Sequence, residues 1–162
     1  MKPNRFMLAL AALCFAAGGA SAQQTDGKSV APKTYKAYMV SDAHLDTQWN
    51  WDVQTTIREY IPRTLFQNLY LMERFPDYRF SFEGGVVYSW MKEYYPAQYE
   101  EMKKYIGEGR WHISGSSWDA TDALVPSTES FIRNIMLGQQ YYRQEFGVES
   151  TDIFLPDCFG FG

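Results

Sequence analysis

Residues 37–46, AYMVSDAHLD, join a short apolar run to a polar segment, and residues 151–160, TDIFLPDCFG, repeat this arrangement. Each apolar run predicts a β-strand, and each polar segment predicts the loop that follows it. The first loop carries His44 and Asp46, and the second carries Asp157. Because α/β folds place their chemistry at the carboxyl ends of strands, both stretches favour an α/β fold with a site built from these three side chains.

The sequence between these stretches alternates strand and helix patterns. Strands are expected at residues 37–40, 78–82, 111–114 and 151–155, and helices at residues 56–75, 86–94, 96–106 and 128–146. A β-α-β-α-β-α-β order favours a parallel sheet with right-handed crossovers. Because the last strand has no helix after it, we interpret the chain as the N-terminal portion of a larger catalytic domain, with a parallel sheet or an incomplete β/α barrel.

The helix boundaries have recognisable signals. Thr56 and Glu59 have the spacing of a capping box, although Pro62 favours a start at that residue, with proline in the first turn. Ser127 is a typical N-cap for the last helix, and Gly147 is a typical residue to end it.

The N-terminus has the composition of a secretory signal peptide. Lys2 and Arg5 precede the apolar residues 6–17, and an Ala-Ser-Ala site ends at Ala22. We therefore expect a signal peptide at residues 1–22, a linker at residues 23–35, and export to the periplasm or the cell exterior. The apolar run, about 12 residues, is too short to span a membrane.

The remaining chain would be acidic, with 13 basic and 19 acidic residues. It has no basic run, so nucleic acid is not an expected partner. Cys158 would be its only cysteine, which excludes an intramolecular disulfide.

The spacing of His44 and Asp46 suits a metal ion. Residues two apart in an extended segment point to the same side, and zinc accepts imidazole nitrogen and carboxylate oxygen together. The alternative is a simple hydrogen bond between these side chains. Asp157 lies before a phenylalanine and a glycine, as in an active-site loop, although an Asx-turn or a helix N-cap would also explain it.

Several other polar or aromatic residues lie near expected strand ends. Trp49 and Trp51 crowd the loop after His44, and the loop at residues 115–122 offers two further carboxylates and Trp118. Glu83 also follows a strand, but we expect it at the surface. A structural role is expected for His112, which lies within the third strand.

Several motifs resemble glycoside hydrolase family 38 α-mannosidases, in the family's order. The first is VSDAHLDTQW at residues 40–49, which is similar to the family's H-x-D-x-x-W motif, and the last is DCFG at residues 157–160. Between them are the strand that ends at Glu83, EGRW at residues 108–111, the loop 118–122, PSTES at residues 126–130, and Arg133-Asn134. The resemblance covers residues 36–162, which would form a partial catalytic domain.

This resemblance implies a retaining, zinc-dependent α-mannosidase that acts on α-mannose-containing glycans. In that family's pattern His44 and Asp46 match zinc ligands, and Asp157 matches a residue that is both zinc ligand and nucleophile. Trp49 matches the aromatic residue that packs against mannose, and Trp118 and Asp122 are further substrate-binding candidates.

The family's fourth zinc ligand, a histidine, and its acid/base carboxylate would lie after residue 162. We therefore expect this stretch to be inactive alone, because glycoside hydrolysis needs a proton donor.

Two other functions are compatible with these residues. A metal-dependent polysaccharide deacetylase can also use an H-x-D segment, with metal-bound water as the nucleophile. A non-catalytic carbohydrate-binding fragment could keep the sugar contacts without the chemistry. The DCFG segment and the position of Trp49 favour the mannosidase over the deacetylase, and an activity assay separates both from the binding fragment.

Overall fold

The computed structural model describes residues 34–160; the expected signal peptide and most of the expected linker lie outside this range. Helices and strands alternate along the chain, as the sequence predicts. The strands are β1 (Ser41–Ala43), β2 (Phe80–Phe82) and β3 (Trp111–Ile113). The helices are α1 (Val53–Thr55), the π-helix η1 (Thr56–Tyr60), α2 (Ile61–Arg74), α3 (Gly85–Tyr94), α4 (Pro96–Gly107) and α5 (Thr128–Phe146).

The three strands form a parallel sheet in the order β1-β2-β3. Ala43 pairs with Phe82, and Phe82 pairs with Ile113, so the three strands end level with one another. Their carboxyl ends, and the loops that follow, therefore lie at one edge of the sheet. The sheet confirms the α/β fold class.

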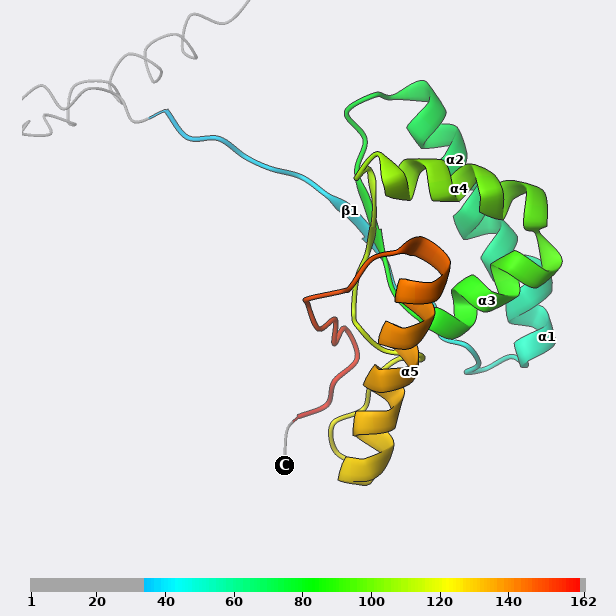
Figure 1. Cartoon of the computed structure of the whole chain (residues 1–162), viewed down its shortest axis with the longest axis vertical. Coiled ribbons are helices and arrows are strands. Elements are labelled where there is room, and N and C mark those ends of the chain that lie inside the picture. Colours follow the sequence, from blue (N-terminus) through cyan, green and yellow to red (C-terminus); the bar gives the residue numbers. More distant parts are fainter. Residues whose placement is uncertain (1–33, 161–162) are drawn as a thin grey trace, which may run out of the picture. The chain divides into compact units, whose positions relative to one another are not determined.

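Helices α2, α3 and α4 lie together on one side of the strands (Figure 1). Phe80 and Phe82 on β2 and Trp111 and Ile113 on β3 point into this core and are buried. Alternate strand residues face opposite sides of a sheet, so His112 points the other way and is exposed. The polar side chains of the candidate site lie beyond the ends of these strands.

The structure corrects two strand predictions. The first strand begins at Ser41, whereas residues 37–40 have no regular structure. The predicted fourth strand at residues 151–155 is absent from the described chain. There, the Ser116 hydroxyl donates to the carbonyl oxygens of Ser150 and Asp152 at 3.1 and 2.7 Å. Hydrogen bonds from a side chain therefore hold this segment, instead of the backbone hydrogen bonds of a β-sheet.

The start of the first helical region also differs from its prediction. Asp52, not Thr56, caps it: the Asp52 carboxylate accepts a hydrogen bond from the Thr55 backbone N–H at 2.8 Å. The Thr56 hydroxyl instead donates to the Thr47 carbonyl oxygen, so the predicted capping box is wrong. Pro62 lies in the first turn of α2, as the alternative prediction requires, because a proline there removes no helical hydrogen bond.

Helix α5 begins and ends as predicted. The Ser127 side chain accepts a hydrogen bond from the Ser130 backbone N–H, and Gly147 adopts the left-handed conformation that ends the helix. Midway along α5, Gly138 packs against the backbone of Ser117, and a methyl group there would lie 2.3 Å from the Ser117 carbonyl carbon. This close contact fixes the loop after β3 against the helix.

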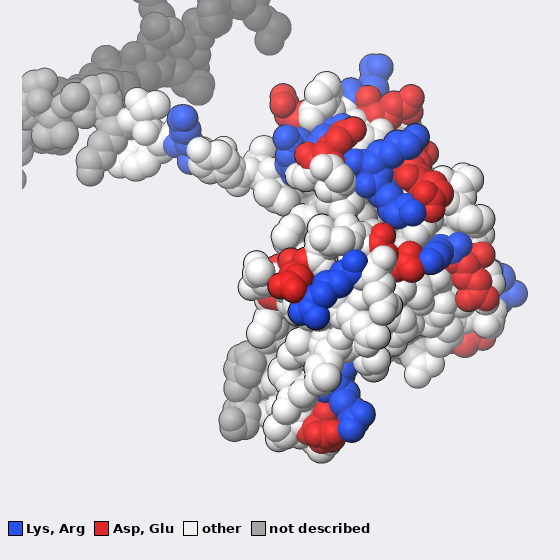
Figure 2. All heavy atoms as spheres, viewed as in Figure 1, with Lys and Arg blue, Asp and Glu red and all other residues white. Residues whose placement is uncertain are grey.

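Within residues 34–160, no helix has the length and hydropathy needed to cross a membrane. On the face drawn in Figure 2, basic and acidic side chains alternate over the helices without forming a patch of one sign. Charge alone therefore marks no binding region on this face.

Candidate active site

His44 and Asp46 lie in the loop directly after β1, where the sequence predicts them. The His44 Nε2 atom is 3.3 Å from Asp46 Oδ1, so both side chains point to the same side, as their spacing predicts. The His44 side chain is 18% exposed and the Asp46 side chain 34%. Both can therefore reach a small ligand from a partly enclosed position.

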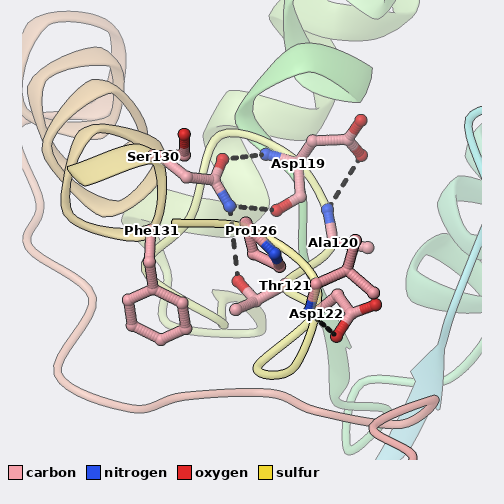
Figure 3. Close-up of a pocket in the computed structure, with 9 residues that line it drawn as sticks. Asp119, Ala120, Thr121, Asp122, Pro126, Ser130 and Phe131 are labelled. Atoms are coloured by element: carbon pink, nitrogen blue, oxygen red, sulfur yellow. Dashed lines mark hydrogen bonds between the residues drawn. The ribbon is translucent and has the colours of Figure 1, made fainter. Parts of the chain in front are cut away.

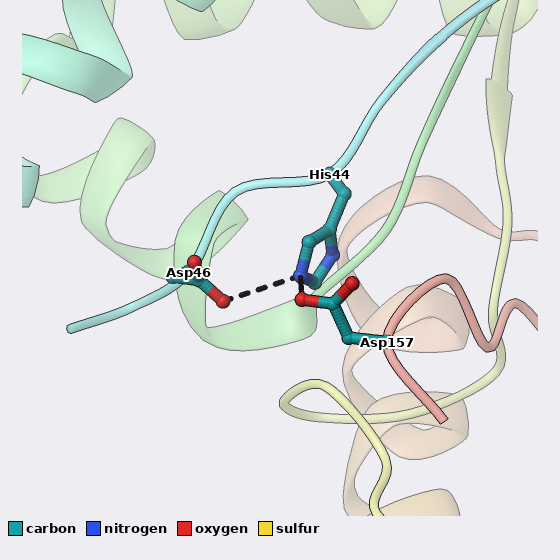
Figure 4. A group of neighbouring side chains, drawn as sticks. All are labelled: His44, Asp46 and Asp157. Atoms are coloured by element: carbon teal, nitrogen blue, oxygen red, sulfur yellow. Dashed lines mark hydrogen bonds and ion pairs between the residues drawn. The ribbon is translucent and has the colours of Figure 1, made fainter. Parts of the chain in front are cut away.

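Asp157 approaches the same nitrogen from the far end of the chain. Its Oδ2 atom lies 3.7 Å from His44 Nε2, and Figure 4 shows both aspartates directed at the imidazole from opposite segments. Asp157 lies in a turn that follows the irregular segment at residues 151–155. Its side chain is 64% exposed, so it is accessible to a substrate.

This trio has a geometry that suits a metal ion. One ligand atom from each of His44, Asp46 and Asp157 lies within 4.8 Å of the other two. Tetrahedral ligands placed about 2 Å from zinc lie roughly 3.3 Å apart, close to the two distances measured from His44 Nε2. The donor set of one nitrogen and two oxygens therefore fits zinc.

Glu83 is the residue that the sequence interpretation misplaced. Instead of lying at the surface it is buried, with 4% of its area exposed, and its Oε1 atom is 2.7 Å from His44 Nδ1. A strand-end acid followed by two glycines was the available signal. Only the strand register shows that Glu83 lies beside His44. Ala43 and Phe82 are paired, and His44 and Glu83 are the residues that follow them.

Burial and charge shift the pKa values of this pair. Burial alone would lower the pKa of His44, but the hydrogen bond and negative charge of Glu83, with the charges of Asp46 and Asp157, outweigh it and raise that pKa. Burial raises the pKa of Glu83, and the hydrogen bond from His44 opposes this shift. Three carboxyl groups around one imidazole thus favour a positive charge at this point.

A cavity of about 370 Å³ opens beside the trio. Its lining residues are His44, Asp46, Trp49, Ala120, Thr121, Asp122, Asp157 and Phe159. The side chains of Trp49 and Phe159 are largely exposed, at 72% and 88%. The cavity therefore combines polar groups that can orient a ligand with aromatic surfaces that can pack against it, as small-molecule sites do.

The structure brings Asp122 to this cavity but not Trp118. The Asp122 carboxylate accepts hydrogen bonds from the backbone N–H groups of Leu124 and Val125, which form a local turn. The Trp118 ring instead packs edge-on against the Tyr141 ring, with 5.5 Å between the ring centroids. Trp118 is therefore placed as an anchor of its loop.

Asp119 and Asn134 hold this loop in position. The Asn134 side chain accepts from the Asp119 backbone N–H and donates to the Asp119 carbonyl oxygen, both at 2.9 Å (Figure 3). The Thr47 hydroxyl donates to the Asp119 carboxylate at 3.2 Å. A second cavity of about 380 Å³ adjoins the first and shares Ala120, Thr121 and Asp122 with it. The loop thus forms a wall between the two cavities.

His112 lies away from this site. Its Nε2 atom is 3.2 Å from Asp152 Oδ1, and both side chains are substantially exposed. Asp152 also accepts a hydrogen bond from the Gly115 backbone N–H at 3.3 Å. This pair links β3 to the segment after α5.

The fold and this cluster define an α/β protein with a polar cluster at its strand ends whose donor atoms could hold a metal ion. Residues 34–162 match the family model described as the glycosyl hydrolases family 38 N-terminal domain. The chain therefore belongs to glycosyl hydrolase family 38.

Curated relatives and solved structures agree with this family. The chain is 34% identical over 126 residues to α-mannosidase G of Dictyostelium discoideum, covering 78% of this chain and 12% of that protein. It is 30% identical over 147 residues to human α-mannosidase 2C1, covering 91% of this chain and 14% of that protein. An α-mannosidase structure from Enterococcus faecalis V583 matches with a TM-score of 0.64 and 26% identity, covering 74% of this chain and 13% of that one. The chain thus spans about an eighth of the length of these relatives.

Proposed function

We propose that this chain contributes the first part of the active site of a retaining, zinc-dependent α-mannosidase that hydrolyses α-mannosidic bonds in glycans. The observation that carries the proposal is the convergence of His44, Asp46 and Asp157 on one point, in a chain of this glycosidase family. The names of the relatives support mannose as the sugar.

His44 Nε2 and one carboxylate oxygen each from Asp46 and Asp157 would hold the ion. When bound, zinc would coordinate neighbouring hydroxyl groups of the sugar and so orient its ring. Trp49 would pack its exposed indole against the apolar face of that ring. These contacts would hold the anomeric carbon within reach of Asp157.

Asp157 would act as the nucleophile. A carboxylate oxygen of Asp157 forms a bond to the anomeric carbon while the glycosidic C–O bond breaks, and a general acid gives its proton to the departing oxygen. Water then attacks the same carbon, loses a proton to the conjugate base of that acid and releases Asp157, so the configuration is retained. The high exposure of the Asp157 side chain supports this role, because a nucleophile must be reached by substrate.

The test compares two substitutions in the full-length product of the gene. Asp157→Asn removes the negative oxygen that attacks the sugar, so kcat on an aryl α-mannoside should fall by more than roughly 10⁴-fold. Asp77→Asn is the matched control, because Asp77 lies exposed in the turn between α2 and β2 and should leave kcat unchanged. Retention of activity by Asp157→Asn would sink the nucleophile assignment.

Zinc content and product analysis separate the competing functions. The mannosidase assignment requires stoichiometric zinc by elemental mass spectrometry and release of mannose. Release of acetate from an acetylated polysaccharide would identify a deacetylase instead. Sugar binding with no product of either kind would identify a carbohydrate-binding protein.

A further inference from the structure

Glu83 is a buried acid that the proposed chemistry does not use. We infer that Glu83 is a positioning residue, which holds the His44 imidazole so that its Nε2 atom faces the metal ion. The inference rests on the proposed metal site, and it adds a residue outside the trio of ligands.

The sheet register places Glu83 beside His44. Ala43 and Phe82 are partners in the parallel pair β1–β2, and the next residue on each strand is His44 and Glu83. Neighbouring strands lie about 4.8 Å apart, so equivalent side chains on one face are in reach of each other. This proximity therefore follows from the register of the two strands, because each residue directly follows the last paired residue of its strand.

The hydrogen bond between them fixes the imidazole. A carboxylate oxygen only accepts hydrogen bonds, so the 2.7 Å contact with Glu83 Oε1 places the proton of a neutral His44 ring on Nδ1. The lone pair then lies on Nε2, which is the atom that faces Asp46 and Asp157. A carboxylate behind a metal-binding histidine commonly plays this role, orienting the ring and making it a better ligand.

The surroundings of Glu83 offer its carboxyl group little beyond the contact with His44. The Glu83 side chain makes one hydrogen bond within residues 34–160, the one with His44, and its Oε2 atom is buried without a partner there. Gly115 closes the space behind it, since a methyl group at that position would lie 3.0 Å from Glu83 Oε2. A buried carboxyl group so poorly compensated is a cost to folding, and such costs are typical of functional positions.

The first test is the affinity for zinc of the metal-free, full-length gene product, measured by competition with a chromogenic chelator. Glu83→Ala should weaken binding about 10–100-fold, because the ring loses its anchor. Glu83→Gln keeps an acceptor oxygen but loses the charge, so its loss should be smaller. Glu73→Gln, on the exposed surface of α2, is the matched control and should bind as the wild type does.

A second measurement needs no Glu83 variant to fold. Nitrogen NMR of histidine-labelled, metal-free protein reports which ring nitrogen carries the proton, with His44→Asn assigning the signals. At a pH at which the ring is neutral, we expect the His44 proton on Nδ1 in the wild type. A neutral ring with its proton on Nε2 would overturn the inference, and so would a folded Glu83→Ala protein with wild-type zinc affinity.

The outcomes separate this inference from the proposed function. Zinc binding that His44→Asn abolishes and Glu83→Ala does not weaken leaves the metal site intact and removes Glu83 from it. A wild-type protein that binds no zinc removes both the metal site and the role of Glu83.

Discussion

At the scale of single residues, close packing sets which positions tolerate change. Gly138 on α5 and Gly107 at the end of α4 are both helical, but their surroundings are opposite. A methyl group on Gly138 would lie within 2.6 Å of the Ser116 and Ser117 carbonyl oxygens, whereas one on Gly107 would have no neighbour within 4 Å. Loop and helix meet at Gly138 without room for a side chain.

Gly138→Ala should therefore destabilise the protein by roughly 1–3 kcal/mol, because the loop at residues 116–118 must move away from α5. Gly107→Ala should stabilise it by about 0.5 kcal/mol, since alanine has the higher helix propensity and meets no obstacle. Thermal unfolding of the two variants beside the wild type measures both effects. Equal melting temperatures for the two variants would contradict the packing seen at Gly138.

At the scale of elements, the π-helix η1 connects the β1 loop to the helical layer. Thr56, at its start, is fully buried. Its hydroxyl donates to the Thr47 carbonyl oxygen and accepts from the Trp51 indole N–H, both at 2.8 Å. Thr47 directly follows Asp46, so this side chain ties the helix to the loop that carries two proposed metal ligands.

Thr56→Val should lower the free energy of unfolding by roughly 1–3 kcal/mol, because the shape is kept while the Thr47 carbonyl and the Trp51 N–H lose their partner. Urea denaturation measures this loss. Thr64→Val on α2 is the matched control, since the Thr64 side chain makes no hydrogen bond within residues 34–160 and is half-buried. If the free energies of unfolding of the two variants differ by less than a few tenths of a kcal/mol, the two Thr56 hydrogen bonds do not stabilise the protein.

At the scale of the whole molecule, tyrosines join the helices behind the sheet. The Tyr88 ring on α3 packs edge-on against the Tyr142 ring on α5, with 6.2 Å between the ring centroids. The ring centroids of Tyr99 on α4 and Phe146 on α5 lie 5.8 Å apart. Burial raises the pKa of Tyr88, Tyr99 and Tyr142, and it raises the pKa of Tyr141 to about 12. The folded core therefore holds these phenol groups in their neutral form.

This core should make the protein unfold in alkali. An unfolded chain ionises tyrosine from about pH 10, so above that pH the unfolded state has released protons that the folded state still binds. Stability should be unaffected by these groups below about pH 10 and should fall as pH rises above it. Tyrosinate absorbance from the core and loss of circular dichroism should then share one midpoint. Ionisation of all tyrosines with the circular dichroism unchanged would contradict the buried placement.

Local sequence signals predicted those parts of the fold and site that depend on neighbours along the chain. Helix α5 runs from the Ser127 cap to Gly147 as its end residues require, and the spacing of His44 and Asp46 was enough to place both beside one point. The apolar run before Asp157 marked it as the third candidate side chain, and the resemblance of the DCFG segment to its family suggested the role of that side chain. These features depend on backbone geometry over a few residues.

Tertiary structure alone decided the rest, because it depends on which segments pair. Residues 151–155 have the composition of a strand. The segment nevertheless lies outside the described sheet, where it is held by hydrogen bonds from the Ser116 hydroxyl to the Ser150 and Asp152 carbonyl oxygens. Glu83 was expected at the surface and lies buried against His44, because the register of β1 on β2 sets them side by side. Register is a relation between segments 39 residues apart, and no local pattern around either residue contains it.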